Sequence, residues 1–314
     1  MSYRLKPDAS IASEVRRLID KQLALAIAEL RAIGDQRSDD AIHEARRHVK
    51  KVRAVLRLVQ PTLGDIYVEA NAHMRTANRL LAPIADGRAV VETLGHLRQR
   101  YAARLDGRTL SSIRSALIER SARIDRKAVI DRVLPRVATV LRAERRRIPK
   151  WTLTARGLRA IAPGLEKSMR RARRSMARVA AEPTSEHYHV WRRRVKDLWF
   201  QLRLLEARCA NKLLDDQRRF EALDGCLGEY HNVLLLEEIL VHGALVSRRQ
   251  TARSLRLLRR YQAALRHQSL RMGYRIFREK PGHFIHRVKG MWRTARPARH
   301  AVARRASWRH AAST

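Results

Sequence analysis

A short basic stretch occurs twice in this chain, at a constant distance. Residues 43–50 read His-Glu-Ala-Arg-Arg-His-Val-Lys, and residues 189–196 read His-Val-Trp-Arg-Arg-Arg-Val-Lys. Both copies run on into Leu-Arg-Leu, at 56–58 and at 202–204, so the offset stays at 146 (189 minus 43). A repeat at this distance predicts two halves that fold alike. Because the shared residues are mostly cationic, we expect both halves to face the same anion.

Apolar residues recur at helical spacing along most of the chain, and alternating strand patterns are almost absent. Hydroxyl and carboxyl side chains at 38–40 and 184–186 favour helix starts, and Pro61 favours a helix end. The pattern predicts an all-α protein of two similar helical bundles, joined near residues 149–154. The expected helices are 9–34, 39–60, 65–82, 86–105, 109–147 (broken near Pro135), 155–181, 185–207, 211–230, 232–247, 250–278 and 283–294.

The charge balance narrows the class of partner. The 314 residues include 68 Lys and Arg against 30 Asp and Glu, a formal net charge of +38, while 45% of the residues are hydrophobic. A folded chain with this charge attracts nucleic acid, anionic membranes, acidic proteins or inorganic polyphosphate. Two cysteines, Cys209 and Cys226, predict reduced structural thiols. No segment approaches the roughly 20 apolar residues of a spanning helix, and we expect a soluble cytoplasmic protein.

A helical wheel separates the cations of the first copy from its apolar residues. At about 100° per residue, a sector of about 120° holds His43, Arg46, Arg47, Lys50, Arg53 and Arg57. The opposite side holds Ile42, Ala45, Val49, Val52, Leu56 and Val59. In the second copy the same sector holds His189, Arg192, Arg193, Lys196 and Arg203, with Trp199 in the place of Arg53. Neither sector contains a carboxylate, which favours a polyanion site over a solvated face. Two such helices facing each other would form a basic groove or pore.

These stretches resemble motifs of the conserved histidine α-helical domain (CHAD) family. Leu-Ala-Pro at 81–83 with Asp86, and the run 196–205, match the family's pattern as well, so that the resemblance extends from about residue 5 to 295. It implies one CHAD domain made of two tandem four-helix bundles, 1–150 and 151–294, related by internal duplication and pseudo-twofold symmetry about a basic channel. A basic disordered tail is expected at 295–314.

The resemblance also implies a stand-alone protein that binds inorganic polyphosphate without catalysis, often at polyphosphate granules, and needs no cofactor. Carried over by position, the polyphosphate-binding residues are His43, Arg46, Arg47, Lys50, Arg53, Arg57, Arg75, Arg79, His189, Arg192, Arg193, Lys196 and Arg203.

Other chemistry fits the residues less well, although non-specific nucleic-acid binding remains the main alternative. His43 and His48 lie about 140° apart on one helix, and the neighbouring arginines would repel a divalent cation, so we expect no metal. A phosphohistidine enzyme would need a carboxylate facing the histidine, which the pattern does not supply, and we expect no catalytic residue. Aromatic residues make up only 5% of the chain, too few for many base-stacking platforms. Tyr188 and Trp191 lie on the apolar side, where core packing is expected, and Trp199 is the exception at the sector edge.

Overall fold

Helices make up nearly all of the regular structure in the computed structural model. It describes residues 3–33, 38–101, 111, 114–115, 126–242 and 247–295, and no β-strand occurs within those ranges. The α-helices are α1 (Ile11–Arg31), α2 (Ser38–Leu58), α3 (Gln60–Leu63), α4 (Asp65–Tyr101), α6 (Arg126–Arg147), α7 (Ala162–Ala181), α8 (Ser185–Leu205), α9 (Leu214–His242), α10 (Arg248–Phe277) and α11 (Pro281–Thr294), and the short 3₁₀-helices are η1 (Ile148–Lys150), η2 (Gly157–Ala160) and η3 (Ala207–Cys209). The all-α prediction is confirmed.

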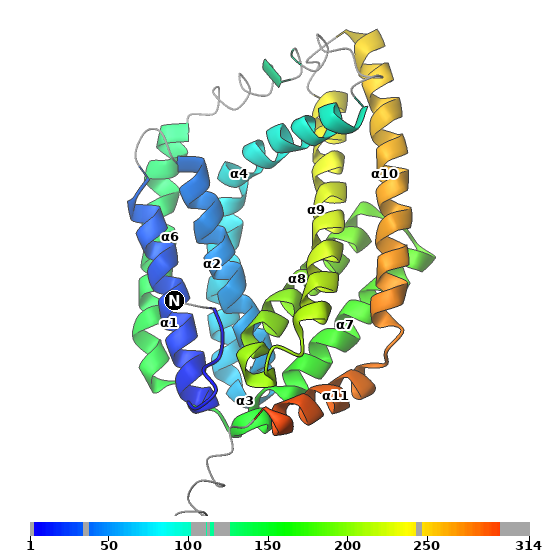
Figure 1. The fold of residues 1–314 in the computed structure, drawn as a ribbon. Coiled ribbons are helices and arrows are strands. Elements are labelled where there is room, and N and C mark those ends of the chain that lie inside the picture. Colours follow the sequence, from blue (N-terminus) through cyan, green and yellow to red (C-terminus); the bar gives the residue numbers. More distant parts are fainter. Residues whose placement is uncertain are drawn as a thin grey trace, which may run out of the picture.

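The helices form two bundles (Figure 1). In the first bundle α1 packs on α2, α2 on α4, α4 on α6, and α6 returns to α1. In the second bundle α7, α8, α9 and α10 follow one another in the same way, α10 touches α7, and α11 lies across α7. Each bundle closes because its helices are amphipathic. In α2 the predicted apolar stripe is fully buried, at Ile42, Ala45, Val49, Val52, Leu56 and Val59.

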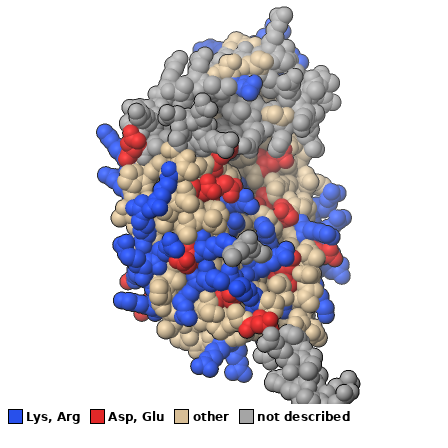
Figure 2. Space-filling view, turned by 60° about the vertical axis from the view of Figure 1, so that its left-hand side comes forward, with Lys and Arg blue, Asp and Glu red and all other residues tan. Residues whose placement is uncertain are grey.

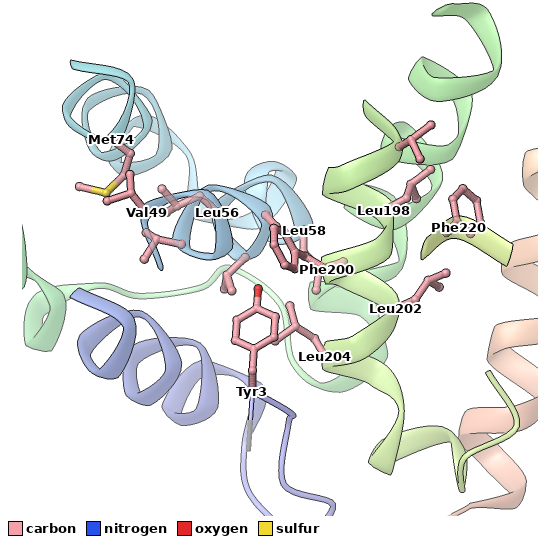
Figure 3. Packing of buried hydrophobic residues seen from close by; sticks show 14 of the residues in the cluster. Tyr3, Val49, Leu56, Leu58, Met74, Leu198, Phe200, Leu202, Leu204 and Phe220 are labelled. Carbon is pink, nitrogen blue, oxygen red and sulfur yellow. The ribbon is translucent and has the colours of Figure 1, made fainter. Parts of the chain in front are cut away.

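The two bundles meet along α2 and α8, with further contacts from α2 to α7 and from α4 to α9. A close approach involves Gly164 of α7, where an added Cβ would lie 1.9 Å from the carbonyl oxygen of Leu58. On another side of this junction, Tyr3 packs edge-on against Phe200 and lies beside Leu204 (Figure 3). The Tyr3 hydroxyl donates to the carbonyl of Lys51 at 3.0 Å, so the start of the chain contacts both α2 and α8.

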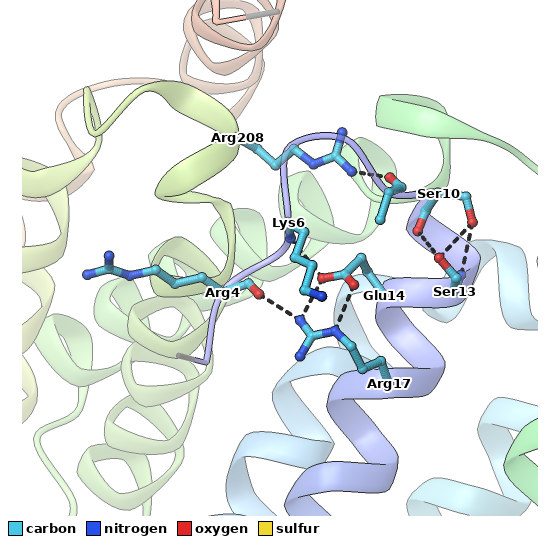
Figure 4. Close-up of polar contacts among 8 residues, drawn as sticks. Arg4, Lys6, Ser10, Ser13, Glu14, Arg17 and Arg208 are labelled. Atoms are coloured by element: carbon cyan, nitrogen blue, oxygen red, sulfur yellow. Dashed lines mark hydrogen bonds and ion pairs between the residues drawn. The ribbon is translucent and has the colours of Figure 1, made fainter. Parts of the chain in front are cut away.

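The segment before α1 ties the first bundle to the end of α8 (Figure 4). Buried Glu14 accepts from the backbone amide of Lys6 at 2.7 Å and from the Arg17 guanidinium at 2.6 Å. The amide of Leu5 donates to the carbonyl of Leu204 at 2.9 Å, and Arg208 donates to the carbonyl of Ala9. Helix α1 then begins at a Ser10 cap, whose hydroxyl accepts from the amide of Ser13.

Several predicted helix boundaries are wrong, and proline explains two of them. Helix α4 continues through Pro83, where an end was predicted, and α6 continues through Pro135. A proline removes one backbone hydrogen bond and permits a kink, but packing on both sides of it can keep one helix. Helix α9 is likewise continuous across residue 231, and α7 starts at Ala162 after η2 instead of at 155.

Other predicted features are confirmed. Helices α2 and α8 begin at Ser38 and Ser185, and the Thr184 hydroxyl caps α8 by accepting from the amide of His187. Helix α2 ends at Leu58, before Pro61. Cys209 and Cys226 are free and buried. The predicted basic tail, apart from Ala295, lies outside the described residues.

Candidate polyanion-binding site

Helix packing determines where the repeated cations point. Helix α8 buries Tyr188, Trp191, Val195 and Leu198 in the second bundle, which confirms the core placement of its first two aromatic residues. In α2 the apolar stripe is buried in the first bundle. The cationic rows therefore turn away from the bundle interiors, toward the place where α2 and α8 meet.

The two rows are adjacent in space. The Gln201 amide of α8 donates to the carbonyl of Ala54 in α2 at 3.1 Å, and both residues are fully buried. The Arg57 guanidinium of α2 forms an ion pair with Asp197 of α8. These contacts bring together two segments that are 146 residues apart in sequence.

The two rows meet at four residues, which we call the central cationic cluster: Arg46 and Lys50 of α2, and Arg192 and Lys196 of α8. Its effect is seen at Lys50, whose pKa is lowered to about 7 by burial and then by the charges of Arg46, Lys196 and Arg192. Asp224 of α9 offsets part of the charge, since it pairs with Lys196 at 2.8 Å. The guanidinium of Arg192 lies beside Gly228 of α9. The cluster therefore concentrates positive charge at a place with little access to water.

His231 of α9 borders this cluster and was missed by the sequence analysis. Its ring lies 5.2 Å from the ring of His189. Burial, together with the charges of Arg192, His189, Lys50 and Arg46, lowers the pKa of His231 to about 3. The available signal was the segment 227–232, which aligns with 81–86 at the same offset of 146.

One flank of the cluster is rich in arginine and contains one buried carboxylate. Burial and then the charge of Arg57 lower the pKa of Arg53 to about 10, and the Arg53 Nε donates to the Asn71 amide oxygen at 3.3 Å. Arg193 and Arg194 of α8 complete the flank, because both act electrostatically on residues of this group. The Arg57 side chain is only 12% exposed and is held by Asp197, which gives it a structural role between the bundles.

The opposite flank carries Arg47 and Lys51 of α2 and Arg203 of α8. Arg47 pairs with Glu44 at 3.0 Å, and burial together with Arg47 lowers the pKa of Lys51 to about 8. Arg203 lies 5.3 Å from the Trp199 ring and Lys196 lies 5.7 Å from it, while Phe200 stacks on that ring at 4.9 Å. Trp199 is thus a packed partner of two cations, where a stacking platform for a base had been considered.

Three further predicted residues are exposed: His43 near the start of α2, and Arg75 and Arg79 on α4. The structure brings together most of the predicted residues of α2 and α8, and Lys51, Arg194 and His231 lie with them.

One face of the molecule is strongly basic. Figure 2 shows Lys and Arg side chains gathered across the middle of one face, with smaller groups of Asp and Glu between them. Among the residues that the structure describes, no group of three His, Cys, Asp or Glu side chains could hold a metal ion. Within the same residues, no helix combines the length and apolar character needed to cross a membrane.

Comparison with known proteins identifies the family. The crystal structure of the CHAD domain from the plant Ricinus communis matches with a TM-score of 0.56 and 15% identity, over 88% of this chain and 96% of that one, and at this identity the likeness concerns the fold. No curated protein matches the sequence. The model of the CHAD domain family matches residues 17–241, well over half of the 314 residues, and the chain therefore belongs to this family.

Proposed function

We propose that this protein binds inorganic polyphosphate, without catalysis, in a basic groove between α2 and α8. A chain of phosphates would run from the flank of Arg53 and Arg193, past the central cationic cluster, to the flank of Arg47 and Arg203. Guanidinium groups suit phosphate oxygens because they can donate two parallel hydrogen bonds, and lysines add charge.

The observation that carries this proposal is the gathering of Arg46 and Lys50 of α2 with Arg192 and Lys196 of α8 in a partly buried place, where burial and the neighbouring charges lower the pKa of Lys50. Gathering four cations between two helices opposes folding, since like charges repel and buried charges lose hydration. A bound polyanion removes both penalties. The family's association with polyphosphate points to the same ligand.

The position of the cations favours a thin polyanion over a duplex. The four residues of the central cationic cluster are partly buried between helices. A flexible chain of phosphates can enter such a place and contact cations on two sides, whereas the phosphates of a duplex lie on a wide, rigid cylinder. Two carboxylates, Asp197 and Asp224, hold Arg57 and Lys196 in position, and the cations around them remain in excess.

The histidines support binding and not phosphoryl transfer. Buried His48 bonds through Nδ1 to the amide oxygen of Gln22 at 2.8 Å, away from the central cationic cluster. His189 has His231 as its ring neighbour, and the low pKa of His231 keeps that ring neutral. A nucleophilic histidine is usually oriented by a carboxylate, and the ring contact that the structure gives His189 is with a second imidazole.

A competition experiment tests the proposal. The purified protein should bind labelled long-chain polyphosphate in moderate salt, and duplex DNA at equal phosphate concentration should leave that complex intact. The double variant Arg46→Glu, Arg192→Glu should lose polyphosphate binding while circular dichroism shows retained helicity. A matched control with the same charge change is Arg132→Glu, Arg136→Glu, two exposed residues of α6, and it should bind normally.

Three results would contradict the proposal. Full displacement by DNA would favour nucleic acid as the ligand of this site. Equal loss in the α6 control would indicate diffuse charge. Release of orthophosphate, or a phosphorylated histidine, would indicate an enzyme.

A further inference from the structure

Helix α10 carries a second basic feature, which the proposed function does not use. Its 30 residues include no Asp or Glu. At about 100° per residue, a sector of about 60° contains eight exposed residues that run into the first residue after the helix. We call this set the α10 stripe: Arg249, Arg253, Arg256, Arg260, His267, Arg271, Tyr274 and Arg278. It extends over about 43 Å at 1.5 Å per residue.

The α10 stripe is separate from the central cationic cluster. Helix α10 packs on α9 and touches α7, and it runs along the outer edge of the second bundle, on the far side from α2 (Figure 1). Its buried side holds Leu257, Leu258, Tyr261, Leu265 and Phe277, so the stripe is the side that packing leaves outside. A ligand on the stripe would not touch α2.

The stripe residues are exposed, whereas arginines beside the stripe contact α9. Arg259 pairs with Glu237 at 3.0 Å, and Arg266 donates to the Tyr230 hydroxyl at 3.2 Å. Within the stripe, like charges follow at four-residue spacing, as in Arg256 and Arg260, which opposes helix formation. A solvated surface helix normally alternates such cations with glutamate.

Helix α6 of the first bundle provides a contrast within the same molecule. It is also an outer helix, yet it contains Asp131 and Glu144, and two of its arginines pair with carboxylates of other helices, Arg145 with Asp20 at 2.6 Å and Arg147 with Glu69. The lack of any carboxylate in α10 is therefore not a general property of the outer helices.

We propose that the α10 stripe is a docking surface for duplex nucleic acid, which it would contact through backbone phosphates and without reading the base sequence. The guanidinium groups are carried by one rigid helix and the phosphates of a duplex lie on a rigid cylinder, so neither backbone loses much freedom on binding. A flexible polyphosphate chain would contact this convex surface from one side only and would lose its freedom for few contacts. A single strand would need stacking platforms, and Tyr274 is the one aromatic residue of the stripe.

The inference goes beyond the proposed function and does not depend on it. If both hold, one molecule carries an inner site for a thin polyanion and an outer site for a wide one. Such a protein would link polyphosphate to a nucleic acid duplex, because the two ligands occupy different helices.

The test uses the full-length protein and a fluorescent 20-base-pair DNA duplex. The triple variant Arg256→Glu, Arg260→Glu, Arg271→Glu should bind the duplex at least tenfold more weakly at about 0.1 M salt. Loss of three phosphate contacts should also reduce the slope of log K against log salt by about 2.7. The control is Arg132→Glu, Arg136→Glu, Arg146→Glu, which makes the same charge change on exposed positions of α6 and should alter affinity less than threefold. Retained polyphosphate binding by the α10 variant shows that it is folded.

Outcomes separate this inference from the proposed function. The variant Arg46→Glu, Arg192→Glu should keep duplex binding although it loses polyphosphate, and polyphosphate on beads should capture the duplex only when wild-type protein is present. Equal loss of duplex binding in the α6 control would assign the binding to diffuse charge and overturn the inference. So would loss in the Arg46, Arg192 variant alone, or a wild-type protein that does not bind the duplex. The milder variant Arg260→Gln should still lower the salt slope by about 0.9, and an unchanged slope would count against the stripe.

Discussion

At the scale of one residue, the charge of Lys50 that suits the proposed ligand lowers the stability of the free protein. Its pKa in the folded protein is about 7, whereas an unfolded lysine has a pKa of about 10.4. Between these values the unfolded chain binds more protons, so this residue makes stability rise with pH in that range. Below pH 7 Lys50 is charged in both states, and the full cost of burying it remains. A buried lysine that pairs with a bound anion is expected to carry this cost while the anion is absent.

The variant Lys50→Met should therefore stabilise the free protein and weaken binding. We expect the melting temperature at pH 6 to rise by roughly 2–4 °C, with a smaller difference near pH 10, where the lysine is neutral in the fold. Polyphosphate affinity at pH 6 should fall roughly tenfold. Calorimetry and a binding titration at each pH measure both quantities.

The same residue predicts a pH dependence of binding. Phosphates raise the pKa of Lys50 in the complex, so binding above pH 7 takes up a proton and wild-type affinity should fall as pH rises past 7. Lys50→Met should lack this part of the decline, while Lys289→Met at an exposed position of α11 should keep it. Parallel pH profiles for all three proteins would show that Lys50 does not couple to the ligand.

Gly164 gives a second prediction at this scale. An alanine Cβ there would lie 1.9 Å from the Leu58 carbonyl oxygen, and that oxygen belongs to packed backbone, so α7 and α2 must separate. We expect Gly164→Ala to lower the free energy of unfolding by about 2 kcal/mol. Gly290→Ala in α11 is the control, since nothing lies within 4 Å and alanine favours a helix interior, and it should be neutral or stabilising. Equal urea midpoints for the two variants would refute the close contact.

At the scale of elements, the sequence predicted helix faces better than helix ends. The faces of α2 follow from the spacing of Ile42, Val49 and Leu56, because one periodicity determines both the buried side and the cationic side. The ends of α4 and α9 depended on local signals at Pro83 and at residues 230–232, and long-range packing overrode them. Local preference is a weak guide wherever a helix is held by neighbours on several sides.

The candidate site was predictable to a similar degree. Residues of the repeated rows could be named from the sequence because both copies of the repeat contain them. Asp197 and Asp224 were not assigned to it, since Asp197 replaces Lys51 outside the cationic sector and Asp224 lies on α9. Which carboxylate meets which cation depends on how two distant helices cross, and periodicity within one helix does not contain that information.

The difference between α2 and α8 can be tested by restoring the missing cation. At the offset of 146, Trp199 corresponds to Arg53. The Trp199 ring lies beside Lys196 and Arg203, which correspond to Lys50 and Arg57. Trp199→Arg should add one phosphate contact and steepen the salt slope of polyphosphate binding by about 0.7. Trp199→Phe keeps an aromatic ring and should leave the slope unchanged. An unaltered slope in the arginine variant would show that the ligand does not reach α8 at this position.

At the scale of the whole molecule, the excess charge and the junction of the bundles are connected. A net charge of +38 repels itself across any interface between the halves, yet α2 and α8 meet through their cationic rows. The ion pair of Arg57 with Asp197 lies at this junction, and the two residues that correspond to it at the offset of 146 are Arg203 and Lys51, a repulsive pair. Asp197 therefore supplies negative charge at one end of an otherwise cationic interface.

Replacing that carboxylate should make the fold depend on the ligand. Asp197→Asn keeps the shape of the side chain but leaves Arg57 buried without its ion pair, and breaking a buried pair costs about 3 kcal/mol. Polyphosphate can return negative charge to the same junction, so the rise in melting temperature caused by the ligand should be larger for Asp197→Asn than for the wild type. The exposed carboxylate Asp131 of α6 provides the control variant Asp131→Asn, which should melt and respond like the wild type. Equal ligand-induced shifts in all three proteins would place the polyphosphate away from the α2–α8 junction, because only a ligand at that junction can compensate for the missing carboxylate.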